Sequence, residues 1–248
     1  MILLRVVGIV QARTGSKRLR NKTVLSLGSR TILGILLERI SASKIMDQVV
    51  VATTTQQRDD IVERIALECG FQIFRGSEDD VLDRYYNAAR TFAAGVIVRI
   101  TADNPLTDAG LADSQVRHLI ENDCDYVTTR NVLLGVGSEA VSFRSLQEAW
   151  RSANQRYQRE HVTPYIYENA DQFKVRYMTP PAFLKQQWGI RLTIDTNQDL
   201  ELYAALQNYF GDLVPVDIRD VVSFLTRTPE IREINMSVRQ KDYRELGS

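Results

Sequence analysis

Five cationic side chains fall within ten residues near the start of the chain: Arg13, Lys17, Arg18, Arg20 and Lys22. They follow the apolar residues 6–10, which are typical of a buried strand, and they surround Gly15 and Ser16. Small residues let a backbone approach a ligand closely and present N–H groups to it. A strand, a small-residue turn and a group of cations together predict polyphosphate binding. A solvated basic loop, with no ligand, is the alternative interpretation of the same residues.

Two aspartates are expected at the ends of strands, where open parallel sheets bind their ligands. Asp103 follows the apolar residues 95–101, and Asp195 ends residues 191–195, which we expect to form a late strand. Mg²⁺ prefers one or two carboxylates together with phosphate oxygens, so this pair predicts a magnesium site. For Asp103 a turn or helix-cap role is the alternative, because Asn104 and the proline after it also favour a turn.

The elements that must position these side chains alternate between strands and helices as far as residue 130. Apolar runs predict strands at 6–10, 49–54, 71–74, 95–101 and 126–129. Helical periodicity predicts helices at 32–40, 60–69, 81–92 and 108–122. We expect Asp59 or Asp60 to cap the second helix and Ser77 to cap the third. The alternation predicts a parallel, doubly wound α/β sheet with a crevice at the carboxyl ends of its first and fourth strands.

Between residues 131 and 187 this alternation is lost. The sequence there predicts a strand at 140–143, a helix capped by Ser145, a helix at 159–168 and a strand at 173–178. Beyond it we expect the strand 191–195, a helix at 199–210 capped by Thr196 or Asn197, and a helix at 217–225. We interpret residues 1–248 as one domain, with residues 131–190 as a small α+β extension within it.

The overall composition excludes several classes of protein. Lys plus Arg and Asp plus Glu are both 31, so no bulk charge favours nucleic acid or an anionic membrane as a partner. Cys69 and Cys124 lack the spacing of a metal site or of a disulfide framework. The sequence shows neither a signal-peptide cleavage pattern nor an apolar run of the roughly 20 residues that a membrane span needs. We therefore expect a cytoplasmic protein.

Residues 11–22, QARTGSKRLRNK, resemble the A-R-x-x-S-x-R-L-x-x-K signature of the sugar-activating cytidylyltransferases. The branch named after spore coat polysaccharide biosynthesis protein F is also similar, in the same order, at residues 75–89, 99–108, 138–150, 159–166 and 191–203. The resemblance implies the nucleotide-diphospho-sugar transferase fold, a Rossmann-like three-layer α/β/α sandwich of mostly parallel strands. It implies Mg²⁺-dependent transfer of CMP from CTP to a small sugar, with release of pyrophosphate, in surface polysaccharide biosynthesis. The sugar would be an acidic one, such as a ketodeoxyoctonate- or nonulosonate-like compound.

The resemblance also implies roles for individual residues. The catalytic residues would be Arg13, Arg18, Lys22, Asp103 and Asp195, the two aspartates being the ligands of Mg²⁺. The nucleotide would be bound by Gln11, Ala12, Arg13, Gly15, Ser16, Lys22, Arg75, Gly76, Ser77, Arg84, Thr101 and Asp103. The sugar would be contacted by Glu139, Arg159, Glu160 and His161. Residues 131–190 would cover the sugar site and supply the contact of a homodimer. The chain departs from the pattern at Ala102, where relatives usually have glycine, and at Asn104, where they often have an acidic residue or cysteine.

Three alternative functions remain open. One is a nucleotide-sugar glycosyltransferase, since residues 123–125 have the D-x-D spacing of many such enzymes. That motif precedes its strand, so it would lie at the wrong edge of the sheet, and the basic first loop also argues against this class. The second keeps the chemistry with UTP or GTP, or with a non-sugar acceptor such as a phosphonate. The third is a non-catalytic binding protein.

Overall fold

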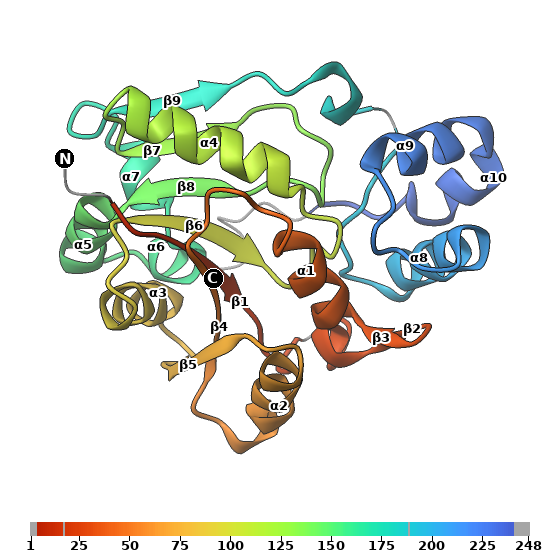
Figure 1. Cartoon of the computed structure of the whole chain (residues 1–248), viewed down its shortest axis with the longest axis horizontal. Coiled ribbons are helices and arrows are strands. Elements are labelled where there is room, and N and C mark those ends of the chain that lie inside the picture. Colours follow the sequence, from red (N-terminus) through yellow and green to blue (C-terminus); the bar gives the residue numbers. More distant parts are fainter. Residues whose placement is uncertain (1–3, 17, 188, 241–248) are drawn as a thin grey trace.

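A seven-stranded sheet of order β5-β4-β1-β6-β8-β7-β9 forms the centre of the computed structural model, which describes residues 4–16, 18–187 and 189–240 (Figure 1). The strands are β1 (Val6–Gln11), β4 (Gln48–Thr54), β5 (Gln72–Gly76), β6 (Val96–Thr101), β7 (Tyr126–Thr129), β8 (Glu139–Ser142) and β9 (Val175–Met178). β8 runs antiparallel to both neighbours, and the other pairs are parallel. A separate hairpin joins β2 (Ser26–Leu27) to β3 (Arg30–Thr31). The predicted, mostly parallel α/β sheet is confirmed.

Helices cover both faces of the sheet (Figure 1). One face carries α1 (Ile32–Ile40), α2 (Asp60–Glu68) and α4 (Ala109–Glu121). The other carries α3 (Val81–Thr91), α5 (Phe143–Ser152), α6 (Arg156–His161) and α7 (Pro164–Glu168). β1, β4 and β6 bury side chains on both faces, as their continuous apolar runs require. The result is the expected three-layer sandwich.

A third apolar cluster lies beside the first turns of α1 and α4. It contains residues of α8 (Asn197–Phe210) and α9 (Ile218–Arg227), which lie next to α10 (Pro229–Arg232) at one side of the molecule (Figure 1). Ile32 and Ile35 of α1 and Leu111 of α4 pack against it. Because helices of a parallel sheet begin near the carboxyl ends of strands, this cluster brings the C-terminal third of the chain to the ligand-binding edge.

Several predicted helix caps are wrong. α3 is capped by Asp80, whose Oδ1 accepts the N–H of Asp83 at 2.8 Å, and Ser77 instead accepts the N–H of Asp80. α5 is capped by Ser142, and its predicted cap Ser145 is the donor of that N–H bond. In each case a second polar residue three positions from the predicted one reaches the free N–H group first. α8 is capped by Thr196, as expected.

Residues 131–190 are built into the main sheet, because they supply the strands β8 and β9. The predicted helix at 159–168 is two short helices, α6 and α7. Between them Val162 has a φ of 74°, outside the helical region, and Pro164 begins the next helix. Pro164 has no N–H group to donate to a carbonyl of the preceding turn, so a continuous helix would lose a hydrogen bond there.

The strand predicted at residues 191–195 does not form. The segment is extended and buried, but its ladder is reduced to a single bridge between Arg191 and Leu134. The N–H of Leu192 donates to the carbonyl of Leu134, and that of Ile194 donates to the carbonyl of Asp103. Its neighbours are loops, so a run of β-type residues here has no strand to pair with.

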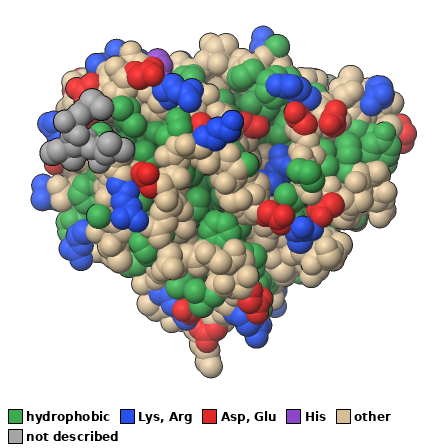
Figure 2. Space-filling view, in the orientation of Figure 1, with side chains coloured by type: hydrophobic (Ala, Val, Ile, Leu, Met, Phe, Trp, Pro, Cys, Tyr) green, Lys and Arg blue, Asp and Glu red, His purple; other side chains and the backbone are tan. Residues whose placement is uncertain are grey.

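No helix in the described part of the chain combines the length and the apolar character needed to cross a membrane. Acidic and basic side chains are interspersed on the face of the molecule shown in Figure 2.

Candidate active site

A buried carboxylate from the segment between β4 and α2 holds the polar loop that follows β1. Asp59 is fully buried, and its Oδ1 accepts both the N–H and the hydroxyl of Thr14 at 2.7 Å. Its Oδ2 accepts the hydroxyl of Thr54 at the end of β4. The prediction that Asp59 caps α2 is wrong for its side chain, which makes no capping hydrogen bond. Asp59 instead fixes the loop to the end of the neighbouring strand, β4.

The loop folds back on itself after Gly15. The N–H of Ser16, expected to face a ligand, donates to the carbonyl of Thr14 at 2.9 Å. The N–H of Asn21 donates to the same carbonyl, and Asn21 adopts a left-handed conformation with φ 58°. This turn places Lys22 at the start of a 3₁₀ turn, Lys22–Val24.

Lys22 joins the two predicted metal ligands. Its Nζ lies 2.9 Å from Asp103 Oδ2 and 2.8 Å from Asp195 Oδ1, and it donates a third bond to the carbonyl of Ile194 at 2.9 Å. Asp103 lies just beyond β6, and Asp195 arrives from the extended segment beside it. Residues separated by 81 and 173 positions in the chain thus converge on one nitrogen atom.

The charged forms of this group stabilise one another. Burial alone would lower the pKa of Lys22, but the attraction of Asp103 and Asp195 outweighs it and raises that pKa above its usual value. Burial alone would raise the pKa of Asp103, but Lys22 and a bond from Thr101 bring it below its usual value. Asp103 is therefore a weak base that is suited to holding a cation.

Two arginines complete the cluster around Asp195. Arg18 Nη2 lies 2.8 Å from Asp195 Oδ1, and Arg191 Nη2 lies 2.9 Å from Asp195 Oδ2. With Asp199, which also pairs with Arg191, the described residues place three cations and three carboxylates in one network. Buried ion clusters contribute little to folding compared with apolar side chains, so a cluster at the crevice indicates binding chemistry.

The ends of β1 and β6 lie side by side in the sheet. Gln11 pairs in register with Thr101, and Gln11 Oε1 is buried without a hydrogen-bond partner among the described residues. Ala12 continues the ladder by donating its N–H to the carbonyl of Ala52. Tyr85 of α3 places its hydroxyl 3.1 and 3.0 Å from the carbonyls of Ile9 and Ile100, and burial raises its pKa to about 12.

Residues predicted to border the nucleoside fall into two groups. Arg84 is 1% exposed, donates to the carbonyl of Ser77, and forms no ion pair with any described residue. Burial lowers its pKa, and its Nε lacks a partner in the described part of the chain. Arg75 instead donates to the carboxylates of Asp60 and Glu63 in α2 and to the carbonyls of Thr54 and Gln56, so its guanidinium joins β5 to α2 and to the end of β4. Gly76 packs against Phe74 and Arg84, with no room for a side chain.

Among the described residues, two further cations of the first loop form no ion pair with Asp103 or Asp195. Arg13 is turned toward Glu78, with its Nη1 3.5 Å from the carbonyl and 3.7 Å from Oε1 of that residue. Arg20 is partly exposed. Lys17 lies outside the described residues.

Of the predicted sugar contacts, Glu139 accepts hydrogen bonds from three side chains. It accepts bonds from Arg99 at 2.7 Å, from the hydroxyl of Tyr126 at 2.5 Å and from Thr163 at 3.2 Å. Burial alone would lower the pKa of Arg99, but Glu139 raises it above the usual value. Arg99 and Glu139 therefore form a neutral, partly accessible pair that joins β6 to β8.

Arg159 is a structural tie. Its guanidinium clasps both oxygens of Asp80, the cap of α3, and donates to the carbonyl of Trp150. It thereby fixes α6 against α3. Glu160 and His161 follow it in the last turn of α6.

The D-x-D motif has a structural role at the opposite edge. Asp125 Oδ1 accepts the hydroxyl of Ser145, and its Oδ2 accepts the N–H of Lys174. The motif precedes β7. Because β8 is antiparallel to both β6 and β7, β7 has the same direction as β6, and its start lies at the edge opposite to the end of β6. The interpretation that this motif is not the metal site fits its position.

Sequence reasoning missed three residues of the site. Asp59 was placed at a helix cap, and Arg99 and Arg191 were placed inside strands without a role. A charged residue within an otherwise apolar run, as in the segment 95–101, is the signal that could have found Arg99. The partner of Asp59 lies 45 positions away in the chain, so no local pattern reveals it.

A mostly parallel α/β fold with cations and carboxylates gathered at the carboxyl ends of β1 and β6 defines a protein class that handles phosphorylated ligands. Comparison with known proteins gives the family. The sequence profile described as "Cytidylyltransferase" matches residues 7–215. The chain therefore belongs to the cytidylyltransferase family of enzymes, which transfer CMP.

Individual relatives agree with this assignment. The spore coat polysaccharide biosynthesis protein SpsF of Bacillus subtilis is 36% identical over 91% of this chain and 95% of its own length. An uncharacterized protein of Methanocaldococcus jannaschii is 54% identical over 98% of this chain and 99% of its own. A solved cytidylyltransferase structure from Leptospira borgpetersenii has a TM-score of 0.87 and 34% identity, covering 96% of this chain and 100% of that one.

Proposed function

We propose that this enzyme transfers CMP from CTP to a hydroxyl group of a small acidic sugar and releases pyrophosphate. The observation that carries the proposal is the convergence of Lys22, Asp103 and Asp195 at the carboxyl ends of β1 and β6. Membership of the cytidylyltransferase family supports CTP as the donor. The role of the relative from Bacillus subtilis in spore coat polysaccharide biosynthesis supports a sugar as the acceptor.

The reaction needs positioning and charge neutralisation. A sugar oxygen forms a bond to the α-phosphorus, the bond from that phosphorus to the bridging oxygen breaks, and the hydroxyl proton leaves to water. The barrier lies in bringing an oxygen nucleophile up to an anionic phosphate. In the proposal Arg13, Arg18 and Lys22 neutralise the β- and γ-phosphates that leave as pyrophosphate. Arginine suits bidentate phosphate contacts, and lysine acts as a point charge.

The carboxylate pair fits a magnesium ion. Asp103 Oδ2 and Asp195 Oδ1 both reach the same cation, the ammonium of Lys22, at 2.9 and 2.8 Å. Two convergent carboxylate oxygens plus phosphate oxygens are the donor set that Mg²⁺ prefers. Mg²⁺ held there would neutralise phosphate charge and polarise the α-phosphate.

Lys22 must change partners before it can reach a phosphate. An ammonium group has three N–H donors, and all three are taken by Asp103, Asp195 and the carbonyl of Ile194. Arg18 is similarly engaged with Asp195, although its side chain is 32% exposed. We infer that triphosphate binding draws these cations from the carboxylates onto phosphate oxygens.

The residues proposed to contact the acceptor sugar come from β8 and α6. Glu139, Arg159, Glu160 and His161 stay predictions as sugar contacts, and Arg159 is already used by Asp80 and Trp150. The homodimer contact in residues 131–190 and the cytoplasmic location are likewise proposals. Light scattering coupled to size-exclusion chromatography would test the dimer.

The experiment that tests the function incubates the protein with Mg²⁺, one nucleotide and one acceptor. CTP, UTP and GTP are each paired with ketodeoxyoctonate, a nonulosonic acid, neutral hexoses and a phosphonate, and products are identified by mass spectrometry. We expect pyrophosphate and a CMP-sugar with CTP and an acidic sugar. Pyrophosphate release with a different nucleotide or acceptor would correct the substrate, whereas nucleoside diphosphate release from nucleotide sugars would make the protein a glycosyltransferase.

A further inference from the structure

Arg191 lies four residues before Asp195, and the site as predicted gives it no role. The segment that carries both residues is pinned at two points rather than paired as a strand. Its Leu192 N–H donates to Leu134, and its Ile194 N–H donates to the carbonyl of Asp103. The backbone of one predicted metal ligand is thus bonded directly to the chain that carries the other.

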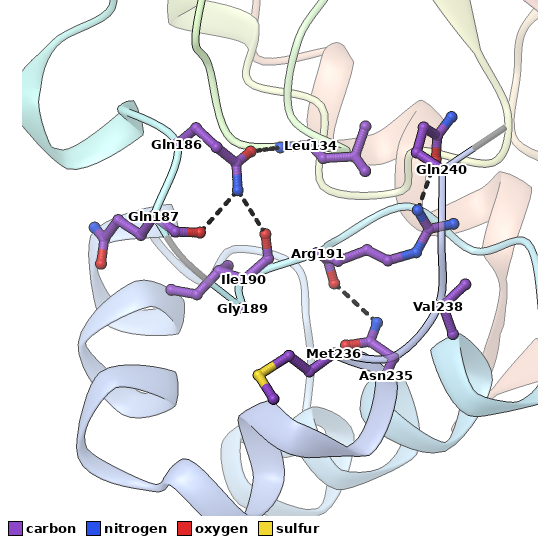
Figure 3. Close-up of a pocket in the computed structure, with 10 residues that line it drawn as sticks. All are labelled: Leu134, Gln186, Gln187, Gly189, Ile190, Arg191, Asn235, Met236, Val238 and Gln240. Atoms are coloured by element: carbon purple, nitrogen blue, oxygen red, sulfur yellow. Dashed lines mark hydrogen bonds between the residues drawn. The ribbon is translucent and has the colours of Figure 1, made fainter. Parts of the chain in front are cut away.

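The guanidinium of Arg191 is buried, with 7% of the side chain exposed. Its Nη2 donates to Asp195 Oδ2 and its Nε donates to Asp199 Oδ1, both at 2.9 Å. On the opposite side its Nη1 donates to Gln240 Oε1 at 2.6 Å (Figure 3). A cavity of about 350 Å³, lined by Arg191, Leu134 and Met236 among others, opens on this far side (Figure 3).

Asp199 connects Arg191 to the backbone of Asp195 through a set of hydrogen bonds, which we call the frame. Its Oδ2 accepts the N–H groups of Asp195 and Thr196, each at 2.9 Å, and its Oδ1 accepts the amide of Asn235 at 2.8 Å. Asp199 is fully buried at the first turn of α8. The backbone and one carboxylate oxygen of Asp195 are therefore held by two groups that themselves have several partners.

The two oxygens of Asp195 consequently have different surroundings. Oδ2 faces Arg191, which is locked in the frame. Oδ1 faces Lys22 and Arg18, the two cations that the proposed reaction moves onto phosphates. In the proposed reaction, Oδ1 therefore changes partners while Oδ2 keeps Arg191.

We propose that Arg191 is a positioning residue that holds Oδ2 of Asp195 and so presents Oδ1 to the metal–triphosphate site. This inference rests on the proposed function, because it takes Asp195 as a metal ligand. A planar guanidinium can hold Asp195 and Asp199 at once through a fixed fork of donors. Lysine keeps the charge but has no such fork, so Arg191→Lys isolates the geometric contribution.

The test measures Mn²⁺ affinity in the presence of a CTP analogue with an uncleavable α–β bridge, by electron paramagnetic resonance of free Mn²⁺. Groups that orient metal ligands typically contribute about 10- to 100-fold to metal affinity. We expect Arg191→Lys to weaken Mn²⁺ binding by at least about tenfold and to lower kcat, with a much smaller change in the KM for CTP. Circular dichroism and thermal melting verify that the variant folds.

Arg39→Lys is the matched control. Arg39 is also a largely buried arginine, but its Nη1 donates to the carbonyls of Leu213 and Val216, away from the carboxylates. Its replacement should lower stability and leave Mn²⁺ affinity unchanged. Equal losses of Mn²⁺ affinity in both variants would mean that Arg191 acts through general stability, which contradicts the proposal.

Arg191→Ala is the second variant, because the adjacent cavity allows a free guanidinium ion to reach the vacated position. Millimolar guanidinium should restore part of the Mn²⁺ affinity, and methylammonium should not. Wild-type Mn²⁺ affinity in folded Arg191→Lys, or the absence of rescue, would overturn the proposal. If Asp195→Asn also kept wild-type affinity, the metal assignment itself would be wrong, which is a separate failure of the proposed function.

Discussion

At the scale of single residues, Lys22 decides how the site is assembled. It is 9% exposed and spends all three donors on two carboxylates and a carbonyl. Its place in a basic loop and the two aspartates were predictable from residue types and their expected positions at strand ends. The hydrogen bonds from Lys22 to both aspartates were not predictable, because they depend on a turn at Asn21 that no sequence pattern indicates.

Replacing Lys22 by methionine tests its role in turnover. The variant loses one cationic donor to the leaving phosphates, and the loss of a single donor to developing charge typically costs about 10²- to 10³-fold in kcat. A pyrophosphate-release assay under saturating CTP measures this. Arg20→Met, in the same loop and partly exposed, is the control and should keep wild-type turnover. A fall of only a few-fold in Lys22→Met would show that Lys22 is structural.

The same lysine gives stability a defined pH dependence. Because its pKa is raised in the folded state, its contribution is complete below the unfolded pKa of about 10.4 and is lost as pH rises through the higher folded value. Asp103, whose pKa is lowered, contributes above about pH 3.9 and loses its contribution as pH falls through its folded pKa. The free energies of unfolding of wild type and Lys22→Met, measured in urea, should differ by a constant amount around neutral pH, and this difference should shrink in strong alkali and in strong acid. A difference that already shrinks between neutral and mildly alkaline pH would contradict this account.

At the scale of elements, the sequence pattern predicted most helices and parallel strands, since buried strands and amphipathic helices have distinct apolar periods. It failed at 191–195, where β-type residues form an unpaired segment, and at the caps Ser77 and Ser145. At 191–195 the cause is that the neighbouring segments are loops, whereas at the two caps a polar residue three positions away, Asp80 or Ser142, accepts the N–H bond instead. The contact of Asp59 with Thr14 joins residues 45 positions apart, so no local pattern reveals it.

Asp59→Ala tests whether the hydrogen bonds from Thr14 to Asp59 position the polar loop after β1. The change leaves the N–H and hydroxyl of Thr14 without their buried acceptor, so we expect a loss of about 3 kcal/mol in the free energy of unfolding. The KM for CTP should rise as well, because the loop loses its anchor.

Asp125→Ala is the matched control for this variant. It also removes a carboxylate that accepts one hydroxyl and one backbone N–H, but at the opposite edge of the sheet. It should be destabilised with an unchanged KM for CTP. A KM that rises equally in both variants would assign the effect to lost stability.

At the scale of the whole molecule, the fold brings the first loop, the end of β6 and the segment before α8 into direct contact. The described cluster balances three cations against three carboxylates. A divalent ion entering alone would add uncompensated charge, whereas CTP brings the negative charge that accommodates it.

Metal and nucleotide should therefore bind cooperatively. We expect CTP to tighten Mn²⁺ binding by at least about tenfold, a coupling of roughly 1.4 kcal/mol, and Mn²⁺ to tighten CTP binding by the same factor. Calorimetric titration of each ligand, with and without the other, measures both changes in affinity. The Mn²⁺ affinity of CTP alone in solution is measured as the control. Independent binding would mean that the cluster does not contain the metal site.

The most direct measurement of the central claim is pyrophosphate release from CTP by Asp103→Asn and Asp195→Asn, with Asp125→Asn as control. The two carboxylates reach the same ammonium nitrogen from distant parts of the chain, so removing either charge should disable the same site. We expect both variants to lose at least about 10²-fold in kcat while Asp125→Asn keeps wild-type activity. Turnover within a few-fold of wild type in either Asp103→Asn or Asp195→Asn would contradict the account.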